Sequence, residues 1–276
     1  MADYGNLYLC PTPIGNLEDI TLRVLKVLNK VDIIAAEDTR HTIKLLNYYN
    51  IKKPLTSYHE HNKRDKGIKL IEELKNGKSI ALVTDAGTPG ISDPGADLVK
   101  LCIEEKVKVI PLPGAVAAIT ALIASGLDTS SFVFEGFLPQ KKKYRDEVLK
   151  RIQLEERTII IYEAPHRLKS TISELAEHIK SRKIVIAREL TKIHEEFIRG
   201  YIEDIIEKID KEIKGEIIIL IEGKKKKDRV VKNPEELLRK YIKNGISKKE
   251  AVKMISEELN ISKNEIYRLS LDLEDL

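Results

Sequence analysis

The sequence predicts an α/β fold made of two α/β domains and a small C-terminal unit that is entirely helical. Three observations support this. Short apolar runs alternate with helical patterns in the first half, a second set of apolar runs follows residue 128, and only helical patterns follow residue 227. Strands that alternate with helices favour a mostly parallel sheet covered on both faces.

The first domain is predicted over 1–128. Its strands are expected as buried apolar runs at 7–11, 31–37, 79–85 and 108–113. Helices are expected between them at 20–30, 41–49, 65–77 and 97–106. A further helix of small residues, 115–126, ends at Gly126, a residue type common just after a helix. Its composition indicates close packing or close approach to a ligand.

The second domain is predicted over 129–223. Strands are expected at 157–167, 183–191, 194–202 and 215–223, two of them close enough in sequence for antiparallel pairing. Two clear helices separate them, one of which is "LKSTISELAEHIK".

The third unit, 228–276, reads as three short amphipathic helices broken at "NGIS" and "NIS". Ser247 and Ser262 stand where an N-cap belongs, and Glu250 and Glu265 follow three residues later, as in a capping box. Two helices joined by a tight turn, with basic faces, are typical of a helix-turn-helix. A small helical capping or dimerisation module is the alternative.

The net charge of +4 is concentrated in the tail. Residues 224–276 hold 14 Lys and Arg against 10 Asp and Glu, so the excess lies entirely after residue 223. A basic appendage on a neutral body indicates an anionic macromolecule as partner. A solvated Lys-rich linker is the alternative.

Composition excludes several classes of protein. Hydrophobic residues make up 42% and charged residues 33%, as in ordinary soluble globular proteins. No apolar run approaches the ~20 residues of a membrane helix, and the first residues lack the pattern of a signal peptide. Cys10 and Cys102 form neither a metal pattern nor a disulfide framework. We therefore expect a cytoplasmic protein with no metal and no membrane contact.

Four strand ends carry loops rich in Gly, Pro or polar residues: "CPTPIGN", "AEDTRH", "TDAGTPGISDPG" and "PLPGAVAA". Parallel sheets bind ligands beyond the carboxyl ends of their strands. The loops contain neither a G-x-G-x-x-G nor a P-loop motif, and 84–95 has no Lys for phosphates. A polar, partly zwitterionic ligand held by backbone groups fits better than a nucleotide polyphosphate. Taken singly, each loop is equally explained as a plain turn.

The strings "LYLCPTPIGNLEDITLRVL", "AAEDTRHTIKLL", "YHEHN", "TDAGTPGISDPG", "PLPGAVAAITALIASGL", "YEAPHRL" and "RELTKIHEE" resemble the ribosomal RNA small subunit methyltransferase I family. That family belongs to the tetrapyrrole-methylase-like (class III) superfamily. The resemblance covers essentially the whole chain, in order. It implies S-adenosyl-L-methionine in a cleft between the two α/β domains, a homodimer, and methylation of the ribose 2′-hydroxyl of a decoding-site cytidine in 16S rRNA.

The resemblance also implies the cofactor site. Thr88, Pro89 and Ile91 would occupy the superfamily's cofactor loop. The turn that holds Pro13 and Gly15 departs from the G-x-G-P turn of the wider superfamily. The full set of expected cofactor residues is Pro13, Gly15, Asp85, Gly87, Thr88, Pro89, Ile91, Val116, Ala117, Tyr162 and Ala187.

A ribose hydroxyl is a weak nucleophile and gains from a nearby proton acceptor. The catalytic candidates are Glu37, Asp38 and His59. Carboxylates paired at a strand end can divide the roles of base and orienting group. Alternatively, Asp38 is a helix N-cap and His59 belongs to an exposed polar loop. Methyl transfer from a sulfonium requires no metal.

Basic residues are expected to contact the RNA. Arg40 suits a bidentate contact to phosphate, and "KKKYR" places basic residues beside an aromatic that can stack. A solvated helix start is the alternative for "KKKYR". The expected RNA-binding residues are Arg40, Lys63, Arg64, Lys141, Lys142, Lys143, Arg145, Lys248, Lys249, Lys263 and Arg268.

Two other functions compete with rRNA methylation. One is methylation of a small molecule or a porphyrin-like macrocycle, which would not require a basic tail. The other is a non-catalytic RNA-binding factor in ribosome assembly, which would not require intact Gly/Pro loops.

Overall fold

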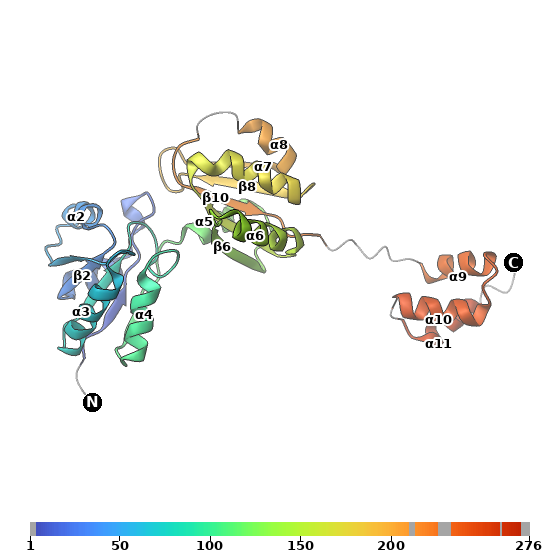
Figure 1. The fold of residues 1–276 in the computed structure, drawn as a ribbon, viewed down its shortest axis with the longest axis horizontal. Coiled ribbons are helices and arrows are strands. Elements are labelled where there is room, and N and C mark those ends of the chain that lie inside the picture. Colours follow the sequence, from blue (N-terminus) through green and yellow to red (C-terminus); the bar gives the residue numbers. More distant parts are fainter. Residues whose placement is uncertain (1–3, 210–212, 226–232, 260, 272–276) are drawn as a thin grey trace. The chain divides into compact units, whose positions relative to one another are not determined.

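The computed structural model describes residues 4–209, 213–225, 233–259 and 261–271 (Figure 1). They divide into two compact units, Met1–Lys224 and Lys225–Leu276. Among the described residues, the larger unit contains two five-stranded sheets and the smaller one contains helices only. Of the basic run 224–229, residues 226–229 lie outside the described residues. Within the described ranges, no helix is long and apolar enough to cross a membrane.

The first sheet is entirely parallel. Its order is β3 (Leu55–Ser57), β2 (Ile33–Ala36), β4 (Ile80–Val83), β1 (Leu7–Leu9) and β5 (Val109–Pro111). Every residue of β4 is buried, as expected for a central strand covered on both faces. The four predicted strands are present; β3 was not expected.

Two pairs of helices cover this sheet. The helices α1 (Leu22–Lys30) and α2 (Thr39–Tyr48) pack on one face through Val24, Leu28 and Leu46. On the opposite face, α3 (Lys63–Lys75) and α4 (Gly95–Glu104) contribute a separate apolar cluster. The predicted parallel sheet with helices on both faces is confirmed.

The second sheet is mixed. Its order is β6 (Phe132–Phe137), β7 (Thr158–Glu163), β10 (Ile217–Ile221), β8 (Lys183–Arg188) and β9 (Glu196–Tyr201). Only β6 and β7 pair in parallel, and the expected antiparallel pair is β8 with β9. β6 was not expected, because a bulge between Phe134 and Gly136 interrupts its alternation.

Helices cover both faces of this sheet as well (Figure 1). On one face lie α6 (Lys142–Leu154), α7 (Leu168–His178) and α8 (Ile202–Lys208). The other face packs against α5 (Ala117–Ser125), which ends at Gly126 with a positive φ of 79°. Although α5 precedes the predicted boundary at 128, its Ala118, Ala121 and Leu122 pack on the second sheet.

The smaller unit consists of α9 (Pro234–Lys243), α10 (Lys248–Leu259) and α11 (Lys263–Leu271) around their own apolar core. The hydroxyls of Ser247 and Ser262 accept hydrogen bonds from the N–H groups of Glu250 and Glu265, each at 3.3 Å. The predicted caps are therefore present. The α/β class with a C-terminal helical unit is confirmed.

Candidate active site

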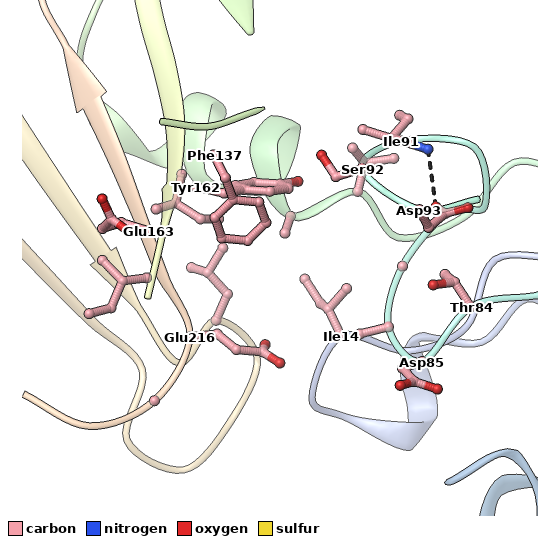
Figure 2. Close-up of a pocket in the computed structure, with 18 of the residues that line it drawn as sticks. Ile14, Thr84, Asp85, Ile91, Ser92, Asp93, Phe137, Tyr162, Glu163 and Glu216 are labelled. Carbon is pink, nitrogen blue, oxygen red and sulfur yellow. Dashed lines mark hydrogen bonds between the residues drawn. The ribbon is translucent and has the colours of Figure 1, made fainter. Parts of the chain in front are cut away.

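A pocket of about 600 Å³ lies between the loops of the first sheet and the strand ends of the second (Figure 2). This volume is within the usual range for small-molecule sites. We call it the cofactor-loop pocket, because the loop 84–95 forms much of one wall. Its lining includes Ile14, Glu37, Asp85, Gly87, Thr88, Ile91, Ser92, Asp93, Val116, Ala117, Phe137, Tyr162, Glu163, Glu189, Lys192 and Glu216.

Backbone geometry explains the composition of loop 84–95. Gly87 and Gly90 have positive φ of 84° and 94°, which glycine adopts without steric cost. The carboxylate of Asp93 accepts hydrogen bonds from the N–H groups of Gly90 (2.9 Å), Ile91 (3.2 Å) and Gly95 (2.7 Å). A β-bridge between Gly87 and Thr12 ties the loop to the end of β1. The loop is therefore held in one shape against the pocket.

The N-terminus of α5 forms part of the same wall. Val116 is its N-cap and makes no side-chain capping bond, and both Val116 and Ala117 line the pocket. The Ala118 N–H donates to the Tyr162 hydroxyl at 3.2 Å, and burial raises the pKa of that phenol. Apart from the Ala118 N–H, whose hydrogen bond Tyr162 accepts, the N-terminus of α5 has no side-chain cap. A helix N-terminus favours an anionic group, because the helix dipole is positive there.

Aromatic rings line the opposite wall. The Phe137 ring is about half exposed and meets Tyr162 edge to face, with centroids 5.7 Å apart. Phe134 also meets Tyr162 edge to face, with centroids 4.9 Å apart. Figure 2 shows Phe137 and Tyr162 facing Ile91 and Ser92 across the pocket. An exposed ring on a supported aromatic cluster offers a stacking surface for a planar group.

Acidic side chains outnumber basic ones in the pocket lining. Among the described residues that line it, six carry carboxylates (Glu37, Asp85, Asp93, Glu163, Glu189 and Glu216) and one, Lys192, carries an ammonium. Lys192 is paired with Glu189 at 2.8 Å, which lowers the pKa of that carboxyl. A negative pocket favours a cationic ligand and disfavours polyphosphates. Within the described ranges, no cluster of three or more His, Cys, Asp or Glu could hold a metal ion.

The expected cofactor residues divide into three groups. Seven line the cofactor-loop pocket: Asp85, Gly87, Thr88, Ile91, Val116, Ala117 and Tyr162. Pro13 and Gly15 instead line an adjoining pocket, which we call the α2 pocket. Pro89 and Ala187 are buried and line neither pocket, and Ala187 packs with the cluster beneath α5. Phe137 and Asp93 were missed, although Asp93 stands within the string that first indicated a binding loop.

The catalytic candidates lie in different surroundings. Glu37 lines the cofactor-loop pocket, and its Oε2 accepts a hydrogen bond from the Thr84 hydroxyl at 2.6 Å. His59 lines neither pocket and hydrogen-bonds with Asn62.

Asp38 has the cap geometry that the sequence left as an alternative. Its Oδ1 accepts from the N–H and Nε of Arg40, at 2.8 and 3.1 Å, and its Oδ2 pairs with Arg40 Nη2 at 2.7 Å. These contacts lower the pKa of Asp38 to about 2, so its carboxylate is a poor proton acceptor.

Several expected RNA contacts are engaged within the protein. Lys63 pairs with Glu60 and Asp97, at 2.8 and 2.6 Å. Arg145, largely buried, bonds to Glu174 and to the Thr171 hydroxyl. Arg40 pairs with Asp38, as described, and Lys248 is half-buried. The remaining expected residues are exposed: Arg64, Lys141, Lys142, Lys143, Lys249, Lys263 and Arg268.

Comparison with known proteins identifies the family. The model of the tetrapyrrole (corrin/porphyrin) methylases matches residues 6–206. The ribosomal RNA small subunit methyltransferase I of Bacillus subtilis is 49% identical, over 96% of this chain and 94% of that protein. Its counterpart from Synechocystis is 48% identical, over 98% and 99%.

A uroporphyrin-III C-methyltransferase from Thermus thermophilus, solved with S-adenosyl homocysteine, shares the fold. Its TM-score is 0.58 at 16% identity, over 79% of this chain and 97% of that one. The identity and coverage of the sequence relatives show that the chain belongs to the ribosomal RNA small subunit methyltransferase I family, within the tetrapyrrole methylases.

Proposed function

We propose that this protein methylates the 2′-hydroxyl of a cytidine ribose at the decoding site of 16S rRNA in the small ribosomal subunit. As a member of its family it is an rRNA methyltransferase, and its methyl donor is S-adenosyl-L-methionine. The observation that carries the proposal is an acidic cofactor-loop pocket together with three exposed lysines, 141–143, which follow the lining residue Phe137 closely in sequence.

The pocket lining fits the donor. S-adenosyl-L-methionine carries a sulfonium, an amino-acid head and a planar adenine. Carboxylates such as Asp85 and Glu216 favour its positive charges, and the N-terminus of α5 favours its carboxylate. The half-exposed Phe137 ring offers a surface for the adenine. Small residues such as Gly87 and Ala117 permit close approach of the backbone.

When bound, the donor supplies an electrophilic methyl group. The protein then has to align the attacking oxygen and provide a proton acceptor. Alignment alone contributes roughly 7 kcal/mol or more to lowering the barrier in well-oriented reactions. A positioned base adds about two to four decades in rate. Carboxylates that line the pocket are the groups available for this task.

Lys141, Lys142 and Lys143 support an RNA substrate. They follow the pocket residue Phe137 closely in sequence and occupy the N-cap and first positions of α6. Positive charge at a helix N-terminus opposes the helix dipole, by about 0.3–1 kcal/mol for each charge. An anionic partner would remove this penalty, and RNA phosphates are such a partner.

We also propose that the enzyme is a homodimer. The helix α5 is apolar except for Thr120 and Ser125, yet Ile119 and Ile123 are 40% and 73% exposed. A helix that is apolar on nearly every side is normally buried. A second copy of the chain would cover this face.

The test uses purified enzyme, labelled S-adenosyl-L-methionine, and small subunits from cells that lack the modification. We expect one methyl group per subunit, mapped by mass spectrometry to the ribose of a decoding-site cytidine. Fully modified subunits serve as the control and should accept no methyl. Methylation of a base, or transfer only to a small molecule, would refute the proposal.

A further inference from the structure

The α2 pocket adjoins the cofactor-loop pocket and has a volume of about 580 Å³. The two pockets share part of their lining, so a ligand in one can reach a ligand in the other. The shared residues are Ile14, Thr84, Asp85, Ala86, Lys192 and Glu216.

One face of α2 forms the wall of this second pocket. His41, Lys44, Leu45 and Tyr48 line it, and their spacing of three and four residues places them on one side of the helix. The side chains of His41 and Lys44 are exposed and make no hydrogen bond or ion pair within the part of the chain that the structure describes. Two side chains that can donate hydrogen bonds to a ligand therefore lie on this pocket wall.

Tyr48 adds an aromatic surface to the same wall. Its side chain is 60% exposed, although its ring is supported edge to face by Tyr49 with centroids 4.9 Å apart. The Tyr49 hydroxyl in turn donates to the Leu17 carbonyl, which fixes this end of α2 to the loop after β1. An exposed, supported ring beside basic side chains is the arrangement that binds an unpaired nucleotide.

Asp85 stands where the two pockets meet. Its Oδ1 accepts the Asp38 N–H at 3.0 Å, and its Oδ2 makes no hydrogen bond to any residue that the structure describes. Glu37 lines only the cofactor-loop pocket and already accepts the Thr84 hydroxyl. Glu216 also lines both pockets, but its carboxylate lies 3.4 Å from the Lys192 ammonium.

We propose that the α2 pocket holds the target nucleotide, with its base on Tyr48 and its phosphate at Lys44, and that Asp85 accepts the proton of the ribose hydroxyl. This inference rests on the proposed function. The 2′ oxygen bonds to the methyl carbon while the carbon–sulfur bond breaks, and that electron pair remains on sulfur. The hydroxyl proton passes to Asp85 Oδ2 and then to water.

The nucleotide site is tested by binding, without methyl transfer. The probe is an rRNA fragment whose target cytidine, as mapped on wild-type subunits, is replaced by 2′-deoxycytidine carrying a photoreactive iodine on its base. We expect a crosslink to Tyr48 and about ten-fold weaker binding of the uniodinated fragment by Tyr48→Ala. Tyr48→Phe keeps the ring and should bind like the wild type. A crosslink outside the α2 pocket, with unchanged binding by Tyr48→Ala, would overturn the assignment.

The proton acceptor is tested with Asp85→Asn. We expect single-turnover methylation, measured at a saturating concentration of S-adenosyl-L-methionine that calorimetry on the variant defines, to fall by about two to four decades. Asp65→Asn, on α3 and outside both pockets, is the matched control. A full rate in Asp85→Asn, or a comparable loss of rate in Glu216→Gln alone, would overturn the role of Asp85.

Failure of the proposed 2′-O chemistry and failure of the nucleotide site give different experimental results. If the wild type methylates a base but the crosslink still maps to Tyr48, the proposed 2′-O chemistry fails and the nucleotide site stands. If the wild type methylates the ribose but the crosslink and the Asp85→Asn rate contradict expectation, the proposed function stands and this inference fails.

Discussion

Replacing Asp93 by Ala should weaken cofactor binding strongly although its carboxylate is occupied by the protein's own backbone. That carboxylate holds the N–H groups of Gly90, Ile91 and Gly95, which brings the two ends of the turn together. Ala cannot accept these bonds. We therefore expect the loop 90–95 to lose its fixed shape while both sheets remain folded.

The magnitude follows from the three bonds. Hydrogen bonds to a charged group contribute about 1.5–3 kcal/mol each. The loop is partly exposed and the three bonds share one carboxylate, so we take roughly 1 kcal/mol for each. A loop destabilised by about 3 kcal/mol that must be reordered by the ligand binds up to about a hundred-fold more weakly.

The assay is calorimetric titration of S-adenosyl-L-methionine into wild type and Asp93→Ala, with thermal unfolding measured alongside. Asp97→Asn is the matched control, because Asp97 lies in the first turn of α4, the helix that directly follows the loop, and pairs with Lys63 instead of the loop. An unchanged dissociation constant in folded Asp93→Ala would refute the reasoning. Equal weakening by Asp97→Asn would refute it too.

Four further predictions test other parts of the molecule. Ala117→Leu should abolish cofactor binding, measured by calorimetry, because the larger side chain fills the pocket. Ala124→Leu, at an exposed position of the same helix, should bind the cofactor with unchanged affinity. Ending the chain at Lys224 should leave cofactor affinity intact and weaken the salt dependence of subunit binding. The slope of log binding constant against log salt concentration should fall by about 0.7 for each lost phosphate contact. An unaltered slope would exclude binding of RNA phosphates by the tail. Ile123→Asp should convert a dimer to a monomer in light scattering, whereas Ile68→Asp, equally an exposed isoleucine, should not. In the folded protein the pKa of Asp38 is lowered to about 2, so the stability that this carboxylate contributes is present above its unfolded pKa and is lost as the pH falls through 2. The free energies of unfolding of wild type and Asp38→Asn should therefore differ at neutral pH and converge in strong acid.

Buried strands were the part of the fold most readily predicted from the sequence. The strands β4 and β10 are buried at every residue, so their apolar runs are unbroken and unambiguous. β3 has only three residues, all half-buried, and its pattern carries little signal. β6 is interrupted by its bulge, and with it the pocket residue Phe137 was missed. The hydrophobic pattern of the sequence therefore predicted the strands whose residues are all buried, and missed β3, which is short and half-buried, and β6, which is bulged.

The site was only partly predictable, because its geometry depends on contacts between distant segments. Glu37 and Asp38 are neighbours in sequence, yet one accepts a hydrogen bond from Thr84 and the other is paired with Arg40. The string "AEDTRH" offers the helix N-cap as one alternative for Asp38, but it does not show that Thr84 donates to Glu37. Asp85 lies at the meeting of two pockets because β2 and β4 are adjacent in the sheet. The order of strands in the sheet is a property of the topology, and the local sequence pattern does not show it.

The string "DAGTPGISDPG" is informative for a different reason. Gly87 and Gly90 are required by positive φ, and Asp93 is required by three backbone N–H groups. Gly95 is required because a Cβ there would stand 2.7 Å from an Asp93 oxygen. These four residues fix the shape of the backbone, whichever groups of the loop touch the ligand. The string is therefore a signature of loop geometry, and the acceptor that the enzyme methylates is decided by residues elsewhere, such as those on the exposed face of α2.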